Sequence, residues 1–145
     1  MANAPYQFAN PSPNEISQTL HDAKVIAVVG LSPDPSRPSY GVARYLQHQG
    51  YRIVPVTPNA DEVLGERAFP NLESIPFAID IVDVFRRSDK VGPHVDEAIA
   101  KGVKTVWLQL GIRDDEAAQR AEQAGVRMIM DRCIAVDHRK LCGAN

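Results

Sequence analysis

Five short apolar segments recur along the chain, and segments with helical periodicity separate most of them. In the first of them, VIAVV at 25–29, the hydrophobic residues follow one another without polar alternation. Such uniform runs are typical of parallel strands that helices cover on both faces. We therefore predict five strands, at residues 25–29, 51–56, 79–85, 105–110 and 126–130.

Between these runs, apolar residues recur every three to four positions, which predicts helices. Asn14 has the side chain of an N-cap, and Gly50, Gly102 and Gly125 suit the left-handed residue that ends a helix. A short helix at 72–75, ended by Pro76, and a solvated C-terminal tail around 137–140 complete the prediction. The longer helices are predicted from 15 to about 23, from 38 or 39 to 49, from 88 or 89 to 101, and from about 114 to 124.

The alternation of strands and helices predicts an α/β fold. We expect a single Rossmann-like, doubly wound domain with a five-stranded parallel sheet in the order 3-2-1-4-5. Residues 14–145 form this domain, and residues 1–13, with prolines at 5, 11 and 13, form an extended N-terminal arm. Ligands of such sheets bind outside the carboxyl ends of the strands, beside the first strand, where the strand order reverses.

Composition narrows the choice of partner. The 145 residues, 44% of them hydrophobic, are enough for one domain with one core. A formal net charge of -2 gives no reason to expect nucleic acid or an anionic membrane as a partner. No apolar run approaches the roughly 20 residues of a membrane span, and the first residues lack the pattern of a signal peptide. We expect a cytoplasmic protein with a small-molecule ligand, and the sequence leaves a protein partner open.

The reactive side chains give no sign of a catalytic or metal centre. Cys133 and Cys142 are too few for a disulfide framework and lack zinc-ligand spacing, so we predict reduced thiols. The four histidines are scattered, and Asp80 and Asp83 have a spacing that puts them on opposite faces of one strand. We predict no catalytic residue and no metal ligand.

Residues that suit an anionic ligand follow several of the predicted strands. Gly30 permits a sharp turn after the first strand, and the next helix offers unpaired backbone N–H groups to an anion. Arg37, Arg86, Arg87 and Arg132 belong to loops at the same edge, and guanidinium groups match phosphate oxygens. The residues predicted to bind the ligand are Gly30, Leu31, Ser32, Ser36, Arg37, Ser39, Tyr40, Pro55, Val56, Thr57, Pro58, Asn59, Phe85, Arg86, Arg87, Gln109, Arg132 and Cys133.

The commonest nucleotide motifs are not matched. Ser32 and Pro35 stand where the second and third glycines of the dinucleotide fingerprint belong. Strand two ends in Thr57 rather than in the acidic residue that binds a ribose 2′-hydroxyl. The Gly-Lys-Ser/Thr signature of a P-loop is absent from the sequence. NAD and ATP hydrolysis are therefore disfavoured, and an NAD(P)-binding redox enzyme or redox sensor stays an alternative.

Several blocks of sequence together resemble one family. They are GLS at 30–32, SRPS at 36–39, VPVTPN at 54–59, DIVDVFR at 80–86, VWLQLG at 106–111 and DRC at 131–133. Over residues 20–142 the chain is similar to the stand-alone CoA-binding domain family. It also resembles the CoA-binding domain of the succinyl-CoA synthetase α subunit and of acyl-CoA synthetases that form a nucleoside diphosphate. The resemblance implies that the ligand is CoA or acyl-CoA.

The resemblance also implies positions for the parts of CoA. The turn at 30–32 and the loop at 36–37 would cradle phosphate, and the segment 55–59 would contact the adenosine end. Phe85, Arg86 and Arg87 would flank the pantetheine and the phosphates. Each of these roles follows from the family's pattern and is an expectation for this chain.

Two departures from the synthetases bear on activity. Succinyl-CoA synthetase phosphorylates a histidine in a second domain and takes its nucleotide from a partner subunit, whereas this chain is expected to form one domain. The synthetase also has a Pro-Asn-Cys block where this chain has Asp131-Arg132-Cys133. We therefore predict a non-catalytic CoA- or acyl-CoA-binding protein that serves as a carrier, sensor or regulatory module. A subunit of an acyl-CoA synthetase complex is an alternative.

Two side chains at the predicted edge invite a chemical role. Cys133 would form a mixed disulfide with the CoA thiol under oxidising conditions if it lay beside it, and a small buried apolar residue is the competing interpretation. Ser32 lacks the second glycine of a nucleophile elbow, so a hydroxyl that faces phosphate or stabilises the turn is the better interpretation.

Overall fold

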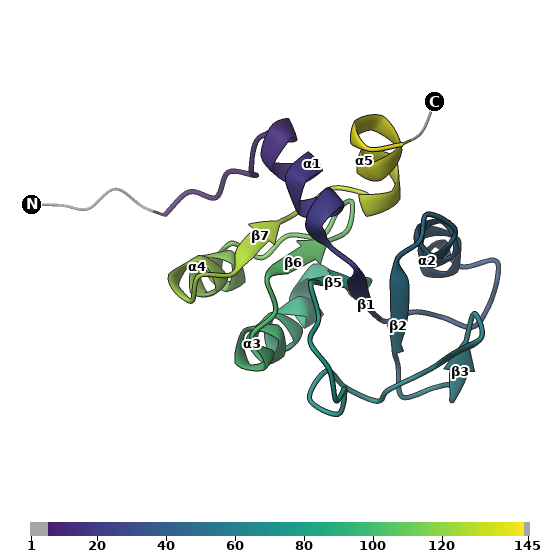
Figure 1. Ribbon diagram of the computed structural model, residues 1–145. Helices are drawn as coiled ribbons and strands as arrows, with labels where there is room; N and C mark the ends of the chain where they lie inside the picture. The colour runs from purple at the N-terminus through teal and green to yellow at the C-terminus, as the bar shows by residue number, and fades with distance from the viewer. Residues whose placement is uncertain (1–5, 144–145) are drawn as a thin grey trace, which may run out of the picture.

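The computed structural model describes residues 6–143, and these build a parallel sheet between two layers of helices (Figure 1). The strand order is β2-β1-β5-β6-β7, and each neighbouring pair is parallel. Strands β5 and β6 are buried along their whole length and β1 is buried after Val25, as expected of strands that are covered on both faces. The strands are β1 (Val25–Val29), β2 (Arg52–Val56), β5 (Ile81–Val84), β6 (Thr105–Leu108) and β7 (Arg127–Ile129).

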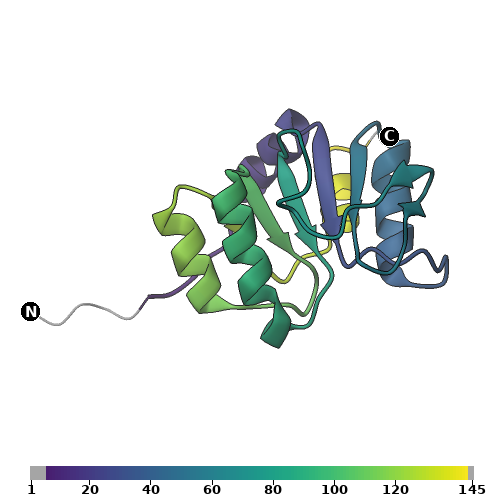
Figure 2. The ribbon, with the colours of Figure 1, turned by 90° about the horizontal axis from the view of Figure 1, so that it is seen from below.

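Helices cover both faces of the sheet (Figures 1 and 2), and the buried side chains form two hydrophobic clusters. On one face, α3 (Val91–Lys101), preceded by the 3-10 turn η1 (Ser88–Lys90), lies beside α4 (Asp115–Gln123). The other face is covered by α1 (Pro13–Asp22), α2 (Pro38–His48) and α5 (Ile134–Leu141). No described helix is both long and apolar enough to cross a membrane.

The Rossmann-like pattern is confirmed, but one strand occupies a different place from the one predicted. The segment expected as the third strand, residues 79–85, pairs with β1 and not with β2. The place beside β2 is taken by Phe69, which forms a parallel bridge to Val56. Its backbone N–H donates to Pro55 and its carbonyl accepts from Thr57, both at 2.9 Å. Counted in chain order with this bridge third, the positions along the sheet are 3-2-1-4-5-6, which contains the predicted 3-2-1-4-5 pattern, and Ile81–Val84 stands fourth.

The connection between β2 and β5 contains a hairpin that the sequence analysis missed. It consists of β3 (Glu62–Val63) and β4 (Glu66–Arg67), joined by Leu64 and Gly65, which both have positive φ. The predicted helix at 72–75 is wrong, because this segment is a turn. The Asn71 side chain accepts the Ser74 N–H at 2.9 Å and stabilises this turn instead.

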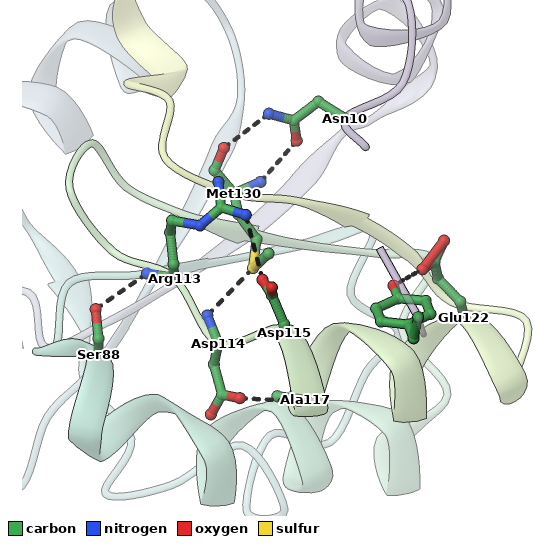
Figure 3. Close-up of polar contacts among 9 residues, drawn as sticks. Asn10, Ser88, Arg113, Asp114, Asp115, Ala117, Glu122 and Met130 are labelled. Carbon is green, nitrogen blue, oxygen red and sulfur yellow. Dashed lines mark hydrogen bonds and ion pairs between the residues drawn. The ribbon is translucent and has the colours of Figure 1, made fainter. Parts of the chain in front are cut away.

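The N-terminal segment joins the domain earlier than predicted. Helix α1 begins at Pro13 and its N-cap is Ser12, so the predicted cap at Asn14 is wrong. Ser12 and Glu15 exchange side-chain to backbone hydrogen bonds of 3.2 and 3.1 Å, which form a capping box. Upstream, the Asn10 amide bonds both the N–H and the C=O of Met130 at 2.9 Å (Figure 3). The predicted arm over residues 1–5 lies outside the described residues.

The C-terminal segment is helix α5, so the predicted solvated tail is wrong. Asp137 and His138 are buried in it. The first free N–H group of the helix, at Ile134, donates to the buried Gln109 side chain at 3.1 Å, so a residue from β6's end caps this helix. This contact is tertiary, which is why local sequence gave no sign of the helix.

Candidate functional site

Two cavities adjoin one another at the carboxyl ends of β1, β2, β5 and β6. Gly30, Ser32, Arg37, Phe85 and Arg86 line both of them. The α2-side cavity has a volume of about 470 Å³ and is also lined by Pro38, Ser39, Val42, Arg87, Gln109, Leu110, Ile112 and Cys133. The β2-side cavity has a volume of about 430 Å³ and is also lined by Val29, Leu31, Pro33, Val56, Thr57, Pro58, Asn59, Pro70, Asn71, His94 and Glu97.

The two cavities meet at the turn after β1. Gly30 has a φ of 83°, and its N–H donates to the Val56 carbonyl at 2.9 Å. A Cβ atom at this position would lie 2.5 Å from the Phe85 carbonyl oxygen, which is closer than real Cβ atoms approach. Both the backbone conformation and the contact therefore require glycine here. The consequence is that the loops after β1 and β5 lie against each other and form one continuous surface.

The loop from β1 to α2 is held by its own serines. The Ser39 hydroxyl oxygen, which is buried, accepts the Ser32 N–H at 3.0 Å. The Ser32 hydroxyl oxygen accepts the Asp34 N–H at 3.0 Å, and the Asp34 carboxylate accepts both the N–H and the hydroxyl of Ser36. The hydrogen bond from the Ser36 N–H lowers the pKa of Asp34. These bonds fix the loop that presents the start of α2 to the α2-side cavity.

The start of α2 suits an anion. Its N-cap residue, Arg37, makes no side-chain cap, and Pro38 at the first helical position has no N–H. No side chain therefore caps the N–H groups of the first turn, and the positive end of the helix dipole lies at the cavity. Arg37 and Arg86 both line the two cavities. Neither arginine forms an ion pair with any residue in the range 6–143.

The four predicted arginines are not equivalent. Arg87 lines the α2-side cavity but pairs with Asp89, Nε to Oδ1, at 3.3 Å on the exposed surface. Arg132 lies outside both cavities, because the buried Asp137 carboxylate holds it through bonds of 2.5 and 2.9 Å. This hydrogen-bonded pairing raises the pKa of Arg132 above its usual value. Arg37 and Arg86 are therefore the cations that the site offers.

The Asp131-Arg132-Cys133 block fastens the loop after β7 to the loop after β6. The Asp131 carboxylate accepts the Gly111 N–H at 2.6 Å, and the Arg132 carbonyl accepts the Trp107 indole N–H at 2.8 Å. Asp131 adopts a positive φ of 58° to do so. Cys133 follows as the N-cap residue of α5 and is half-buried in the wall of the α2-side cavity.

Further contacts position the loop between β6 and α4 (Figure 3). The Arg113 N–H donates to the Ser88 hydroxyl at 3.0 Å, which joins this loop to the start of η1. Asp114 caps α4 through the Ala117 N–H at 3.0 Å, and its own N–H contacts the Met130 sulfur at 3.3 Å. The loop therefore has a fixed conformation on its core side. Its outer side presents Leu110, 70% exposed, at the rim of the α2-side cavity.

The two cavities differ in chemical character. The α2-side cavity has an apolar wall formed by Val42, Phe85, Leu110 and Ile112. The β2-side cavity has a mixed lining, in which apolar surfaces such as those of Val56 and Pro58 lie beside polar side chains from α3 and the loops, among them the half-buried His94. Burial lowers the pKa of His94, and the nearby Arg86 charge adds to this effect, so the imidazole is neutral at neutral pH.

Most of the predicted binding residues come together. Ser36, Tyr40, Pro55 and Arg132 line neither cavity. The rest of the predicted set lines one or both of them. The cavities are also lined by residues that were not predicted, namely Val29, Pro33, Pro38, Val42, Pro70, Asn71, His94, Glu97, Leu110 and Ile112.

Position along the chain could have identified some of the missed residues. Leu110 and Ile112 follow a strand whose carboxyl end was already assigned to the site, and Val42 lies one turn into the helix after the glycine turn. No such signal exists for His94 and Glu97, because tertiary packing decides which face of α3 borders the cavity. Within residues 6–143, no group of three or more His, Cys, Asp or Glu side chains is arranged to hold a metal ion.

The sheet order, the glycine turn and the arginine-lined cavities define a Rossmann-like domain with a site suited to an anionic ligand. A family model described as the CoA binding domain matches residues 24–139. The chain belongs to this CoA-binding domain family.

Comparison with individual proteins gives relatives of two kinds. The chain is 43% identical over 129 residues to an uncharacterized protein, YneT, of Bacillus subtilis, covering 89% of this chain and 96% of that one. It is 30% identical over 122 residues to the acetate–CoA ligase [ADP-forming] II subunit alpha of Pyrococcus furiosus. That match covers 77% of this chain and 27% of the ligase subunit, so this chain resembles about a quarter of the subunit.

Solved structures share the whole fold. A hypothetical protein from Pyrococcus horikoshii superimposes with a TM-score of 0.89 at 34% identity, covering 96% of this chain and all of that one. A Thermus thermophilus protein, described as cell-free ID.343, superimposes with a TM-score of 0.86 at 41% identity, covering 90% and 99% of the two chains. The fold described above is therefore that of small proteins of similar length.

Proposed function

We propose that this protein binds CoA or acyl-CoA at the two adjoining cavities and performs no chemical step on it. The observation that carries the proposal is the meeting of Gly30, Arg37 and Arg86 where both cavities join, beside the uncapped start of α2. CoA carries a pyrophosphate and a 3′-phosphate, so it requires several cations and backbone donors close together. Membership of the CoA-binding domain family supports the same ligand.

The different lining of the cavities supports an orientation for the ligand. The adenosine end would occupy the β2-side cavity, against the apolar surfaces of Val56 and Pro58. The pyrophosphate would lie at the junction, within reach of Arg37, Arg86 and the loop after β1. The pantetheine arm would extend along Phe85 and Val42 in the α2-side cavity, so that its thiol end approaches Cys133. In this orientation a mixed disulfide between Cys133 and CoA would have a short path.

The role that we propose is a carrier, a sensor or a regulatory module. His94, which lines the β2-side cavity, has a pKa lowered by burial, which makes it a poor cation for phosphate and leaves recognition to the arginines. The Asp131-Arg132-Cys133 block, which departs from the synthetases' pattern, is engaged in contacts that fasten loops together. The neutral His94 and the structural contacts of residues 131–133 support a protein that binds CoA and does not transfer a group to or from it.

A second candidate function is that of a subunit in an acyl-CoA-forming complex. The 30% identity to an ADP-forming acetate–CoA ligase subunit favours it. A protein with a nucleotide-grasping fold should then co-purify with the affinity-tagged chain. Its addition should produce acyl-CoA from a carboxylic acid, CoA and a nucleoside triphosphate, which this chain alone should not do.

Calorimetric titration with CoA, 3′-dephospho-CoA and NADH, each at low and high salt, tests the proposed ligand. We expect micromolar binding of CoA, weaker binding of 3′-dephospho-CoA, and a loss of affinity at high salt because exposed cations are screened. If NADH binds saturably and the titration with CoA gives no heat of binding, the proposal is rejected, and a redox role for the same fold is favoured.

A further inference from the structure

Gln109 lies just after β6 in the wall of the α2-side cavity, and it is buried, with 6% of its surface exposed. Its Oε1 atom accepts the Ile134 N–H at 3.1 Å. Because an N–H group can only donate, this bond fixes which end of the Gln109 carboxamide is the oxygen. The Nε2 group therefore stands at the other end, and it donates to no residue in the range 6–143.

The Nε2 group of Gln109 is accessible from the cavity. Within residues 6–143, the two carboxyl oxygens of Asp83 are the only side-chain polar atoms that are fully enclosed without a hydrogen-bond partner. Gln109 Nε2 is not one of them, so it borders open space, and the cavity that Gln109 lines is the α2-side cavity. Two N–H donors of a buried amide therefore face this cavity, where a ligand can accept from them.

Ser39, on the α2 wall of the same cavity, shows the same pattern. Its buried hydroxyl oxygen accepts the Ser32 N–H at 3.0 Å, and its own proton has no acceptor among the described residues. In Ser39 and Gln109 alike, the protein uses the acceptor and leaves the donor to the cavity. A matching ligand brings hydrogen-bond acceptors to both places. A phosphate at the start of α2 supplies the acceptor for Ser39, and the acceptor for Gln109 must be a different group.

Gln109 lies at the thiol end of the proposed CoA orientation. The N–H that its side chain accepts belongs to Ile134, which directly follows Cys133, and Cys133 lines the cavity where the thiol would approach. Val84 pairs with Leu108, so Gln109 follows β6 beside Phe85, along which the pantetheine arm would extend. A free thiol brings no oxygen to this place. An acyl thioester does, because its carbonyl oxygen is attached to the carbon next to the sulfur.

The surroundings of Gln109 suit the rest of an acyl group. The start of α5 presents the positive end of its dipole beside the Gln109 carboxamide, which favours a carbonyl oxygen with partial negative charge. Leu110 and Ile112 follow Gln109 and line the same cavity, and most of the Leu110 side chain is exposed. A short alkyl chain beyond the carbonyl would cover part of this apolar surface.

We propose that Gln109 makes this protein selective for acyl-CoA over free CoA, by donating a hydrogen bond from Nε2 to the thioester carbonyl oxygen. The inference rests on the proposed function and narrows its ligand to an acyl thioester with a short apolar acyl group. Gln109 positions the thioester and takes no part in a chemical step.

Acetyl-CoA and its thioether analogue S-ethyl-CoA give a direct test, because they differ in the carbonyl oxygen and in little else. Calorimetry with the whole protein measures the dissociation constants of both ligands and of CoA. We expect acetyl-CoA to bind about fivefold more tightly than S-ethyl-CoA, which corresponds to one net hydrogen bond. Equal affinities for these two ligands, with CoA bound, would overturn this inference and leave the proposed function standing. A protein that binds none of the three would overturn both.

The variant Gln109→Glu separates the donor from the cap of α5. Its carboxylate still accepts the Ile134 N–H, which favours the ionised form, but it has no N–H to donate. We expect the two affinities to become equal at pH 8. Repulsion between the new charge and the phosphates acts on both ligands alike, so it does not alter their ratio. Gln123→Glu, at an exposed position of α4, makes the same change of charge outside both cavities and should keep the ratio of the parent protein.

A different acceptor for Gln109 would give a different result. If Gln109→Glu weakened CoA, acetyl-CoA and S-ethyl-CoA by the same factor, the Nε2 donor would serve a carbonyl group of the pantetheine arm, and the inference would be overturned.

Leu110→Ser tests the apolar part of the acyl site. The parent protein should bind butyryl-CoA more tightly than acetyl-CoA, and Leu110→Ser should reduce this advantage by about threefold. Val136→Ser is the matched control, because Val136 is an exposed apolar residue of α5 that lines neither cavity. An unchanged advantage in Leu110→Ser would contradict the placement of the acyl chain.

Discussion

A Cβ atom built on Gly30 would lie 2.5 Å from the carbonyl oxygen of Phe85. Gly30→Ala must therefore displace the loop after β5 in addition to straining a backbone with a φ of 83°. We expect a lower melting temperature and a loss of CoA affinity of more than tenfold. Gly102→Ala is the matched control, because Gly102 has a φ of 80° and nothing within 4 Å of the added Cβ. It should cost about 1–2 kcal/mol of stability from backbone strain and leave CoA affinity unchanged.

Arg37 and Arg86 line both cavities without an ion-pair partner among the described residues, so each should contribute to binding a phosphate. We expect Arg37→Ala and Arg86→Ala each to weaken CoA binding by about tenfold, and to reduce its dependence on salt. Calorimetry at two salt concentrations measures both effects. Arg44→Ala, at an exposed position of α2 outside both cavities, serves as the control. Equal CoA affinities for all three variants would show that neither Arg37 nor Arg86 contributes to CoA binding.

Arg132 should behave differently from those two arginines, because its guanidinium is bonded to the buried Asp137 carboxylate. Asp137→Asn should lower the free energy of unfolding by about 1–3 kcal/mol, since it removes charge-assisted bonds from a buried group. The exposed pair of Arg87 and Asp89 gives the comparison, and Asp89→Asn should cost less than about 0.5 kcal/mol. Urea unfolding measures the free energy of unfolding of both variants. Similar losses of free energy for Asp137→Asn and Asp89→Asn would contradict the structural role of Asp137.

Asp83 is fully buried in β5 and neither carboxyl oxygen has a hydrogen-bond partner. Burial raises its pKa well above 3.8, so the folded protein holds this proton more tightly than the unfolded chain does. The stabilisation is complete below the unfolded pKa of about 4 and is lost as pH rises toward the folded pKa. Stability should therefore fall with rising pH, by at most about 1.4 kcal/mol per pH unit from this one group.

Asp83→Asn isolates that effect, because every other titrating group is shared with the parent protein. We expect the stability of the variant relative to the parent, measured by urea unfolding, to increase as pH rises above about 5, and to stop increasing once pH exceeds the folded pKa of Asp83. Parallel stability profiles over this range would show that the Asp83 proton has no part in the pH dependence.

The sequence predicted the elements whose signals are local. Uniform apolar runs located the five strands of the main sheet, and Gly102 ends α3 as a left-handed residue. The cap of α1 was predicted at Asn14 and is Ser12, although a local signal for Ser12 is present, because Ser12 and Glu15 have the spacing of a capping box and Pro13 stands at the first helical position. Signals of this kind involve residues that are close in sequence, so they can be interpreted without knowing the tertiary structure.

The parts that the sequence did not predict depend on contacts between distant residues. Helix α5 begins with its N–H bonded to Gln109, and its basic sequence gives no local start signal. Phe69 pairs with β2 as an isolated bridge, too short to appear as an apolar run. Arg132 belongs to the predicted edge by its position in the chain, and only the fold brings the buried Asp137 carboxylate to it.

The central claim is that CoA binds where the loops after β1, β5 and β6 meet. Titration of ¹⁵N-labelled protein with CoA, followed by NMR, tests both the binding and its place. We predict that the amide signals of Gly30, Ser32 and Phe85 move together with a common dissociation constant, and that those of Gly50 and Tyr51, at the opposite edge of the sheet, stay unchanged. Signals that do not move, or that move at that opposite edge instead, would contradict the account.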